Sequence, residues 1–162
     1  MKLSNNFSLA ELTKSQTAVR KNIKNEPGTA EINNLIHLAE AVLQPVREHF
    51  GKPVMISSGY RSPALCEAIG SSAKSQHAKG EAADFEINGV DNKELATWIT
   101  KNCDFDQLIL EFYDKTKGTN SGWVHVSYNE KGNNRKQVLT YDGKKYENGL
   151  PEMKWEGGKV VG

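Results

Sequence analysis

The sequence lacks several features that would assign it to a class of protein before any motif is considered. No apolar run approaches the roughly 20 residues of a membrane-spanning helix, and residues 1–6 contain a lysine with no apolar segment after it. We therefore expect no membrane segment and no secretory signal, and we expect synthesis in the cytoplasm. With 2 cysteines in 162 residues and no CxxC motif, a disulfide framework and a zinc knuckle are excluded. Cys66 and Cys103 are expected to be buried free thiols.

An excess of charge of one sign is also missing. The 21 basic and 20 acidic residues give a net charge of +1, so nothing favours a nucleic acid or a membrane surface as partner. What is present is the composition of an ordinary globular protein, 37% hydrophobic and 25% charged. The length predicts one domain over residues 1–162, with a core at about 7–147 and a loose tail at 148–162, and we expect a monomer.

Helix signals fall mainly in the first hundred residues of the chain. Capping patterns begin at Ser8, Ser62 and Asp91, because a hydroxyl or carboxylate at these positions can accept a hydrogen bond from the first helical turn. The predicted helices are a short one after 8–11, a long one over 29–50 kinked by Pro45, a short one over 62–70 and one over 91–101, with a loop or broken helix at 13–28.

Strand signals are concentrated in the second half. The predicted strands are 53–57, 82–88, 107–113, 123–128, 138–141 and 144–146. Segments 107–113 and 123–128 are expected to pair, and Asp142-Gly143 indicates a two-residue hairpin. Helices first and strands later predict an α+β fold, in which small helices pack on a mainly antiparallel sheet.

The segment 75–84 contains the first candidate metal ligands. Alternation over 82–87 places Asp84 on the polar face of a strand, and Gly80 permits a turn that brings His77 toward it. Imidazole and carboxylate are both zinc ligands, and a catalytic zinc site needs three such groups and an open position. The third ligand must come from elsewhere, with His37, His49 and His125 as the candidates.

His125 is the strongest of these three. Alternation puts it on one face of a central strand with Trp123 and Ser127. Alone, it would be interpreted as a hydrogen-bonded histidine in a half-buried sheet, but His77 and Asp84 favour a ligand role. His37 and His49 fall off the apolar stripe of their helix and are expected to be surface histidines.

The order and spacing of these residues resemble the zinc D-alanyl-D-alanine peptidase family. The similarity extends from about Phe7 to Tyr128 and rests on Phe7-Ser8-Leu9-x-Glu11-Leu12, Gly59-Tyr60-Arg61-Ser62-Pro63, Ser75-x-His77-x-x-Gly80-x-Ala82-x-Asp84 and Trp123-x-His125. The family includes D,D-carboxypeptidases, enzymes of vancomycin resistance and phage endolysins, and shares its fold with the hedgehog signalling domain. The resemblance implies a zinc ion held by His77, Asp84 and His125, with Arg61 and Ser75 holding substrate.

One position departs from the family pattern. Many members carry an acidic general base three residues before the last histidine ligand, and this position is Gly122 here. We predict that Glu111 is the base, because its strand is expected to pair with that of His125 while Leu110 and Phe112 point to the opposite face. Weaker alternatives are Asp106 and Asp114, and no geometric reason favours Glu81 or Glu86.

These observations predict a zinc-dependent peptidase that cleaves peptidoglycan stem peptides, either carboxypeptidase-like or endolysin-like. A phage or virion-associated protein that acts on the bacterial cell wall is the expected setting. The competing hypothesis is a binding module for cell wall or virion that keeps zinc as structure and has lost catalysis, which Gly122 would allow. D-Ala-D-Ala, L-Ala-D-Glu and cross-bridge bonds all remain open as the bond that is cut.

Overall fold

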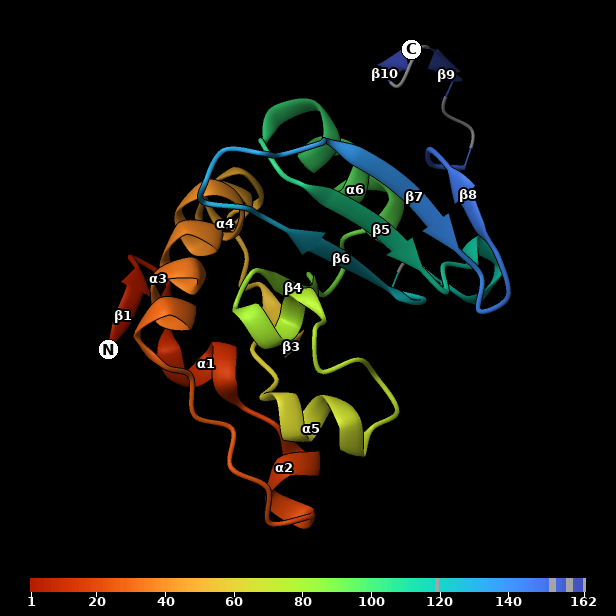
Figure 1. Cartoon of the computed structure of the whole chain (residues 1–162). Coiled ribbons are helices and arrows are strands. Elements are labelled where there is room, and N and C mark those ends of the chain that lie inside the picture. Colours follow the sequence, from red (N-terminus) through yellow and green to blue (C-terminus); the bar gives the residue numbers. More distant parts are fainter. Residues whose placement is uncertain (119, 152–153, 157–158, 162) are drawn as a thin grey trace.

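A mixed sheet of six strands lies at the centre of the computed structural model, which describes residues 1–118, 120–151, 154–156 and 159–161. The strand order is β3-β4-β6-β5-β7-β8 (Figure 1), and every neighbouring pair is antiparallel except β5 and β7. This α+β, mainly antiparallel arrangement is the predicted one. The strands are β3 (Met55–Ser58), β4 (Ala82–Glu86), β5 (Gln107–Glu111), β6 (Trp123–Ser127), β7 (Gln137–Tyr141) and β8 (Tyr146–Asn148).

Short helices surround the sheet, and α6 lies across its back next to β5 and β6 (Figure 1). The small hairpin of β1 (Lys2–Ser4) and β2 (Phe7–Ser8) precedes the first helix, whose predicted capping box of Ser8 and Glu11 is present. The helices are α1 (Leu9–Thr13), α2 (Gln16–Arg20), α3 (Thr29–Leu38), α4 (Gln44–Phe50), α5 (Pro63–Ala68) and α6 (Asn92–Asn102), with single helical turns η2 (Gln76–Lys79) and η3 (Lys115–Lys117).

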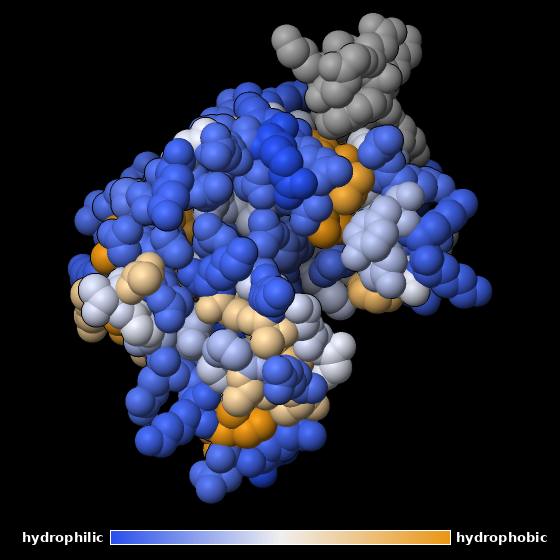
Figure 2. Space-filling model, in the orientation of Figure 1, coloured by the Kyte–Doolittle hydropathy of each residue, from blue (hydrophilic) through white to orange (hydrophobic). Residues whose placement is uncertain are grey.

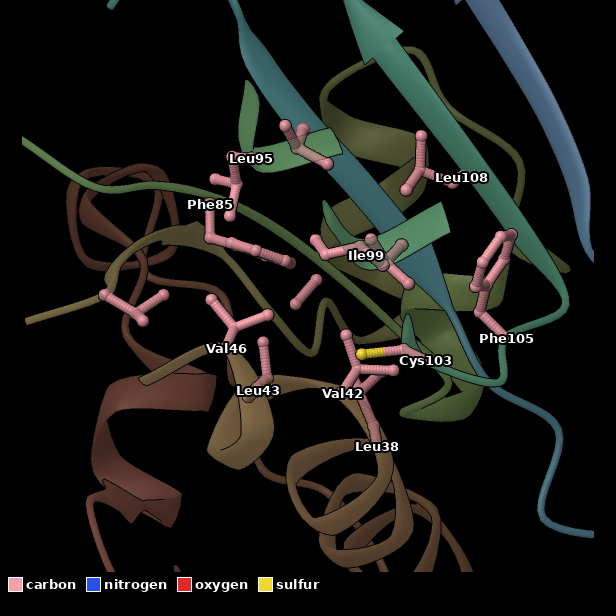
Figure 3. Packing of buried hydrophobic residues seen from close by; sticks show 14 of the residues in the cluster. Leu38, Val42, Leu43, Val46, Phe85, Leu95, Ile99, Cys103, Phe105 and Leu108 are labelled. Carbon is pink, nitrogen blue, oxygen red and sulfur yellow. The ribbon is translucent and has the colours of Figure 1, made fainter. Parts of the chain in front are cut away.

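The apolar core lies on one face of the sheet. Strand alternation points Phe85, Leu108 and Val126 to this face, where they are fully buried. Figure 3 shows Val46 from α4 and Leu95 and Ile99 from α6 packed around Phe85. Because the helices cover this face, the polar side chains at the alternate positions of β4, β5 and β6 are left on the other face.

The helix predicted over 29–50 is continuous. Its backbone departs from α-helical geometry just before Pro45 rather than kinking at it. Residues Ala39–Leu43 form a π-helical turn, η1, between α3 and α4, and the backbone N–H of Gln44 bonds to the carbonyl of Ala39. Proline has no N–H and its ring crowds the carbonyl four residues earlier. A wider turn just before Pro45 accommodates the ring without ending the helix.

Residues 13–28 follow the broken-helix alternative, because they contain a short helix, α2, in which the Ser15 side chain accepts a hydrogen bond from the backbone N–H of Ala18. Two other local predictions need correction. The hairpin between β7 and β8 turns over 142–145 rather than two residues, since the Asp142 carboxylate accepts from the backbone N–H groups of Lys144 and Lys145. Phe112 has a positive φ of 56° and does not continue the alternation of β5.

Both cysteines are free and buried, as predicted. Burial raises the pKa of the Cys103 thiol to about 11, which keeps it protonated at neutral pH. Among the described residues, no helix is long and apolar enough to cross a membrane.

The C-terminal segment contains a two-stranded hairpin, β9 (Lys154–Glu156) with β10 (Lys159–Val161). Residues 152–153, 157–158 and 162, which belong to the predicted loose tail, lie outside the described residues. The loose tail and the single domain therefore stay predictions.

Candidate metal centre

His77 is held in place by the backbone around it. It lies in η2, where the hydroxyl of Ser75 accepts a hydrogen bond of 3.1 Å from its backbone N–H. Gly80 ends this turn with a φ of 73°, and a Cβ there would lie 2.4 Å from the carbonyl oxygen of Glu31. Glycine is therefore required for the segment to pack against α3 and turn into β4.

The imidazole of His77 has a defined tautomer. Its Nδ1 lies 2.7 Å from the carbonyl oxygen of Gly59, and a carbonyl can only accept a hydrogen bond. Nδ1 therefore carries the proton, and Nε2 presents a lone pair toward Asp84. This carbonyl partner is the kind of outer contact that orients a ligating histidine in metal sites.

Asp84 and His125 face each other across neighbouring strands. The register of β4 and β6 places them directly opposite, and Asp84 Oδ1 lies 2.8 Å from His125 Nδ1 and 3.5 Å from His77 Nε2. A ligand atom from each of the three residues lies within 4.8 Å of the others. Ligand atoms around a tetrahedral zinc ion lie roughly 3.3 Å apart, given bonds of about 2.0–2.1 Å, so the group fits a single zinc ion with small adjustments.

The site is buried and favours an ionised carboxylate. His77, Asp84 and His125 are 5%, 8% and 8% exposed, values at which an unpaired charge would be costly. Burial alone would raise the pKa of Asp84, but the hydrogen bond from His125 and the proximity of the His77 ring outweigh it and hold that pKa well below its usual range. Asp84 is therefore available as an anionic ligand at neutral pH.

Glu111 lies on the same face of the sheet, at the end of β5. It is directly opposite Trp123, and Trp123 lies two positions before His125 on β6. Burial raises the pKa of Glu111 and the charge of Asp84 raises it further, while His125, a hydrogen bond from Trp123 and Arg61 act in the lowering direction. The net direction is upward, which makes Glu111 a better proton acceptor than an ordinary glutamate.

Arg61 lies next to the His77 segment. Its backbone N–H bonds to the carbonyl of His77 at 3.1 Å, and its Nε is buried with no hydrogen-bond partner among the described residues. Arg61 helps line a cavity of 390 Å³, together with Ser57, Ser58 and residues of α2 and α5, and none of the three candidate ligands lines it. None of the described residues around this cavity is acidic, so its chemistry suits an anionic or carbonyl group.

A hollow in the molecular surface opens between two parts of the fold. In Figure 2 it separates the part formed by α2 and α5 from the part formed by the end of β5, the start of β6 and β8. A larger cavity of 1130 Å³ lies elsewhere, between α6 and residues 112–117, and none of the three candidate ligands lines it. The chemistry of the side chains, rather than cavity size, therefore identifies the site.

The family model for Peptidase M15 matches residues 5–127. This span includes the three candidate ligands, Arg61 and Glu111. The chain belongs to the Peptidase M15 family. Membership indicates peptidase activity and agrees with the resemblance found in the sequence motifs. Among curated proteins, none matches the chain.

Gly122 occupies the position where many members of the family carry an acidic base, and here no side chain fits. Its φ is 66°, and a Cβ would lie 2.0 Å from the carbonyl oxygen of Glu111. The buried side chain of Asn92 donates to the carbonyls of Ser121 and Gly122 and fixes this turn. No acidic side chain can therefore occupy this position in this M15 peptidase, and Glu111 is an acidic residue that lies on the same face of the sheet as Asp84 and His125.

The alternative acidic residues have other partners. The buried carboxylate of Asp106 binds Arg135 and Gln76, and the hydrogen bond from Arg135 lowers its pKa. Asp114 is partly exposed and caps η3 through Thr116. Neither arrangement suits a proton acceptor at the candidate metal site.

The remaining acidic and histidine candidates also lie apart from the ligand cluster. Glu81 precedes β4 and Glu86 ends it, and neither is among the side chains that converge. His37 lies 3.8 Å from Glu130, and the exposed ring of His49 stacks on Trp98 at 4.4 Å. These two histidines are surface residues, as predicted.

Some residues that build the site could not be recognised from the sequence. Asn25 lies outside the predicted motifs. Its side chain accepts a hydrogen bond of 2.7 Å from the backbone N–H of Ser62 and donates one of 3.0 Å to the carbonyl of Tyr60. It therefore holds the segment that carries Arg61. The carbonyl of Gly59 was equally hidden, because backbone groups leave no residue-type signal. Ser75, predicted to hold substrate, has a capping role in the structure, and its substrate role stays a prediction.

Proposed function

We propose that this M15 peptidase is a zinc enzyme that hydrolyses peptide bonds in peptidoglycan stem peptides. The observation that carries the proposal is the convergence of His77, Asp84 and His125 on the polar face of the sheet. Two imidazoles and one carboxylate match the three-ligand sets of catalytic zinc sites, which leave one position open. Their burial and the hydrogen bond on His77 Nδ1 support a preformed site.

The chemistry divides between the metal and the chain. Zinc bound there would polarise the scissile carbonyl and lower the pKa of a coordinated water. Glu111 would accept a proton from the attacking water and return it to the leaving amine, so that the C–N bond breaks as the amine becomes neutral. The raised pKa of Glu111 supports both steps, because the group must take up a proton and release it within one turnover.

Arg61 would hold the substrate. Its guanidinium offers parallel donors to a carboxylate or a carbonyl oxygen, and peptidoglycan stem peptides contain both. None of the described residues around its cavity is acidic, which supports this role. Ser75 lies beside this segment and is a second candidate contact.

The expected place of action is the bacterial cell wall, in a phage or virion context as an endolysin-like or carboxypeptidase-like enzyme. This part of the proposal rests on the resemblance to wall-cleaving peptidases. Peptidoglycan peptides are the proposed partner.

Mass spectrometry of purified peptidoglycan tests the function and identifies the bond. We expect the zinc-loaded protein to release peptides with new amine and carboxylate ends, and the chelator-treated protein to release none until zinc is restored. Equal release with and without zinc would contradict zinc dependence. No release under any metal condition would contradict a peptidoglycan peptidase.

A further inference from the structure

The indole of Trp123 contacts the carboxylate that we assign as the base. Trp123 and Glu111 are directly opposite in the register of β6 and β5, so both side chains lie on the face that carries Asp84 and His125. The Nε1–H of Trp123 donates a hydrogen bond to Oε2 of Glu111. Since an indole nitrogen is only a donor, this contact favours the ionised, accepting form of the carboxylate.

The indole ring is itself held in place by an unusual residue. Phe112 has a φ of 56°, which takes its side chain off the core face predicted for it. Its ring lies 5.1 Å from that of Trp123 and 5.6 Å from that of Tyr141. A positive φ is rare for a large side chain, and here it coincides with an aromatic support for the indole.

A glutamate at this position would otherwise lack a fixed orientation. The negative charge of Asp84 repels the Glu111 carboxylate, whereas His125 and Arg61 attract it from different elements. The carboxylate also raises the pKa of Tyr146 on β8. The hydrogen bond to Oε2 removes this ambiguity, because it leaves Oε1 as the free oxygen of the carboxylate. Catalysis by a positioned base depends on such orientation, and misplacement of about 1 Å can cost 100-fold in rate.

We infer that Trp123 is a positioning residue that orients Glu111 for proton transfer. The inference rests on the proposed role of Glu111 as base. Trp123 contacts the assigned base rather than the reacting atoms, and its effect passes through one hydrogen bond.

The test replaces the N–H while keeping an aromatic ring. In Trp123→Phe, kcat on peptidoglycan peptides should fall roughly 10- to 100-fold, the effect of losing one hydrogen bond to a charged group. KM, zinc content and thermal stability should stay close to wild type. Trp98→Phe is the matched control, because Trp98 lies on α6 and stacks on His49 away from the site, and it should leave kcat unchanged. Parallel losses of stability and zinc in Trp123→Phe would contradict a positioning role.

A double-mutant cycle separates this inference from the assignment of the base. In the Glu111→Gln background, Trp123→Phe should cause no further loss of kcat. An equal loss in both backgrounds would overturn the positioning role alone. If Glu111→Gln keeps wild-type turnover, the base assignment fails and the inference fails with it.

The hydrogen bond can also be observed without activity. The chain has 3 tryptophans, so the ¹⁵N-labelled, metal-free protein should give few indole N–H signals. The signal that disappears in Trp123→Phe belongs to Trp123. That signal should move upfield in Glu111→Gln, since a neutral amide oxygen accepts more weakly than a carboxylate. An unchanged signal would overturn the inference.

Discussion

Arg135 and Asp106 form a two-pronged ion pair, with Nε and Nη2 of the arginine each 2.9 Å from a carboxylate oxygen. Asp106 also accepts a hydrogen bond from Gln76 at 3.1 Å. The pair therefore ties the loop before β7 and the segment that carries His77 to the start of β5. A carboxylate committed to these contacts stabilises the fold and is a poor base.

This pair should make stability depend on pH. The hydrogen bond from Arg135 lowers the pKa of Asp106 in the folded protein, so the stabilisation is present above the unfolded pKa of about 4 and is lost as pH falls through the folded pKa. Asp106→Asn should lower the free energy of unfolding by about 1–3 kcal/mol at pH 7, with a difference from wild type that shrinks below about pH 4. Urea unfolding at several pH values measures this, and Asp104→Asn, an exposed carboxylate nearby, is the control. A difference that does not vary with pH would contradict the ion pair.

Glu111→Gln should retain zinc and fold but lose most turnover. Glutamine keeps the size of the side chain and can still accept a hydrogen bond from Trp123, but it cannot take up the proton. General base catalysis contributes typically about 100- to 10,000-fold, so kcat should fall within that range.

Glu147→Gln is the control for this variant, because Glu147 is an exposed glutamate on β8. Near wild-type hydrolysis by Glu111→Gln would show that the base lies elsewhere, and loss of zinc would show that Glu111 is a ligand. A binding module without catalysis would show no hydrolysis in the wild type either, and its metal and fold would not respond to this change.

Arg61→Lys should impair substrate handling more than folding. Lysine keeps the positive charge but cannot make a two-pronged contact with a carboxylate, so kcat/KM should fall about tenfold while the melting temperature changes little. Steady-state kinetics and thermal melting of the same preparation measure both quantities. Arg20→Lys, on the exposed end of α2, should behave as wild type. Wild-type kcat/KM in Arg61→Lys would exclude the substrate clamp.

Gly122→Ala should destabilise the protein more than Gly132→Ala. Both glycines have a positive φ, but only Gly132 has free space for a Cβ. A Cβ at Gly122 would lie 2.0 Å from the carbonyl oxygen of Glu111, whereas one at Gly132, where φ is 89°, would meet no atom within 4 Å. Both variants carry the cost of a positive φ, about 1–2 kcal/mol, and the excess at Gly122 measures the clash. Equal unfolding free energies would mean that the turn can accept a side chain.

Alternation predicted the faces of the sheet well, because a strand places neighbouring residues on opposite sides. It located Asp84 and His125 on one face, and Gly80 predicted the turn that brings His77 to them. The pairing of β5 with β6 was also predictable, since a short polar loop joins them. These features follow from local sequence.

The parts that local sequence could not predict depend on contacts between distant segments. The left-handed backbone at Phe112 interrupts the alternation of β5 and follows from packing against Trp123 and Tyr141. The hydrogen bond between Trp123 and Glu111 depends on strand register, which no motif encodes. Asn25 and Arg135 contact segments 35 and 29 residues away, and their residue types gave no sign of it.

Elemental analysis of protein purified without chelator tests whether His77, Asp84 and His125 hold a zinc ion. We expect one zinc ion per chain in the wild type and a content near zero in His77→Ala, while His49→Ala, which changes a surface histidine, should keep the full content. A wild-type content near zero, or an unchanged content in His77→Ala, would contradict this assignment.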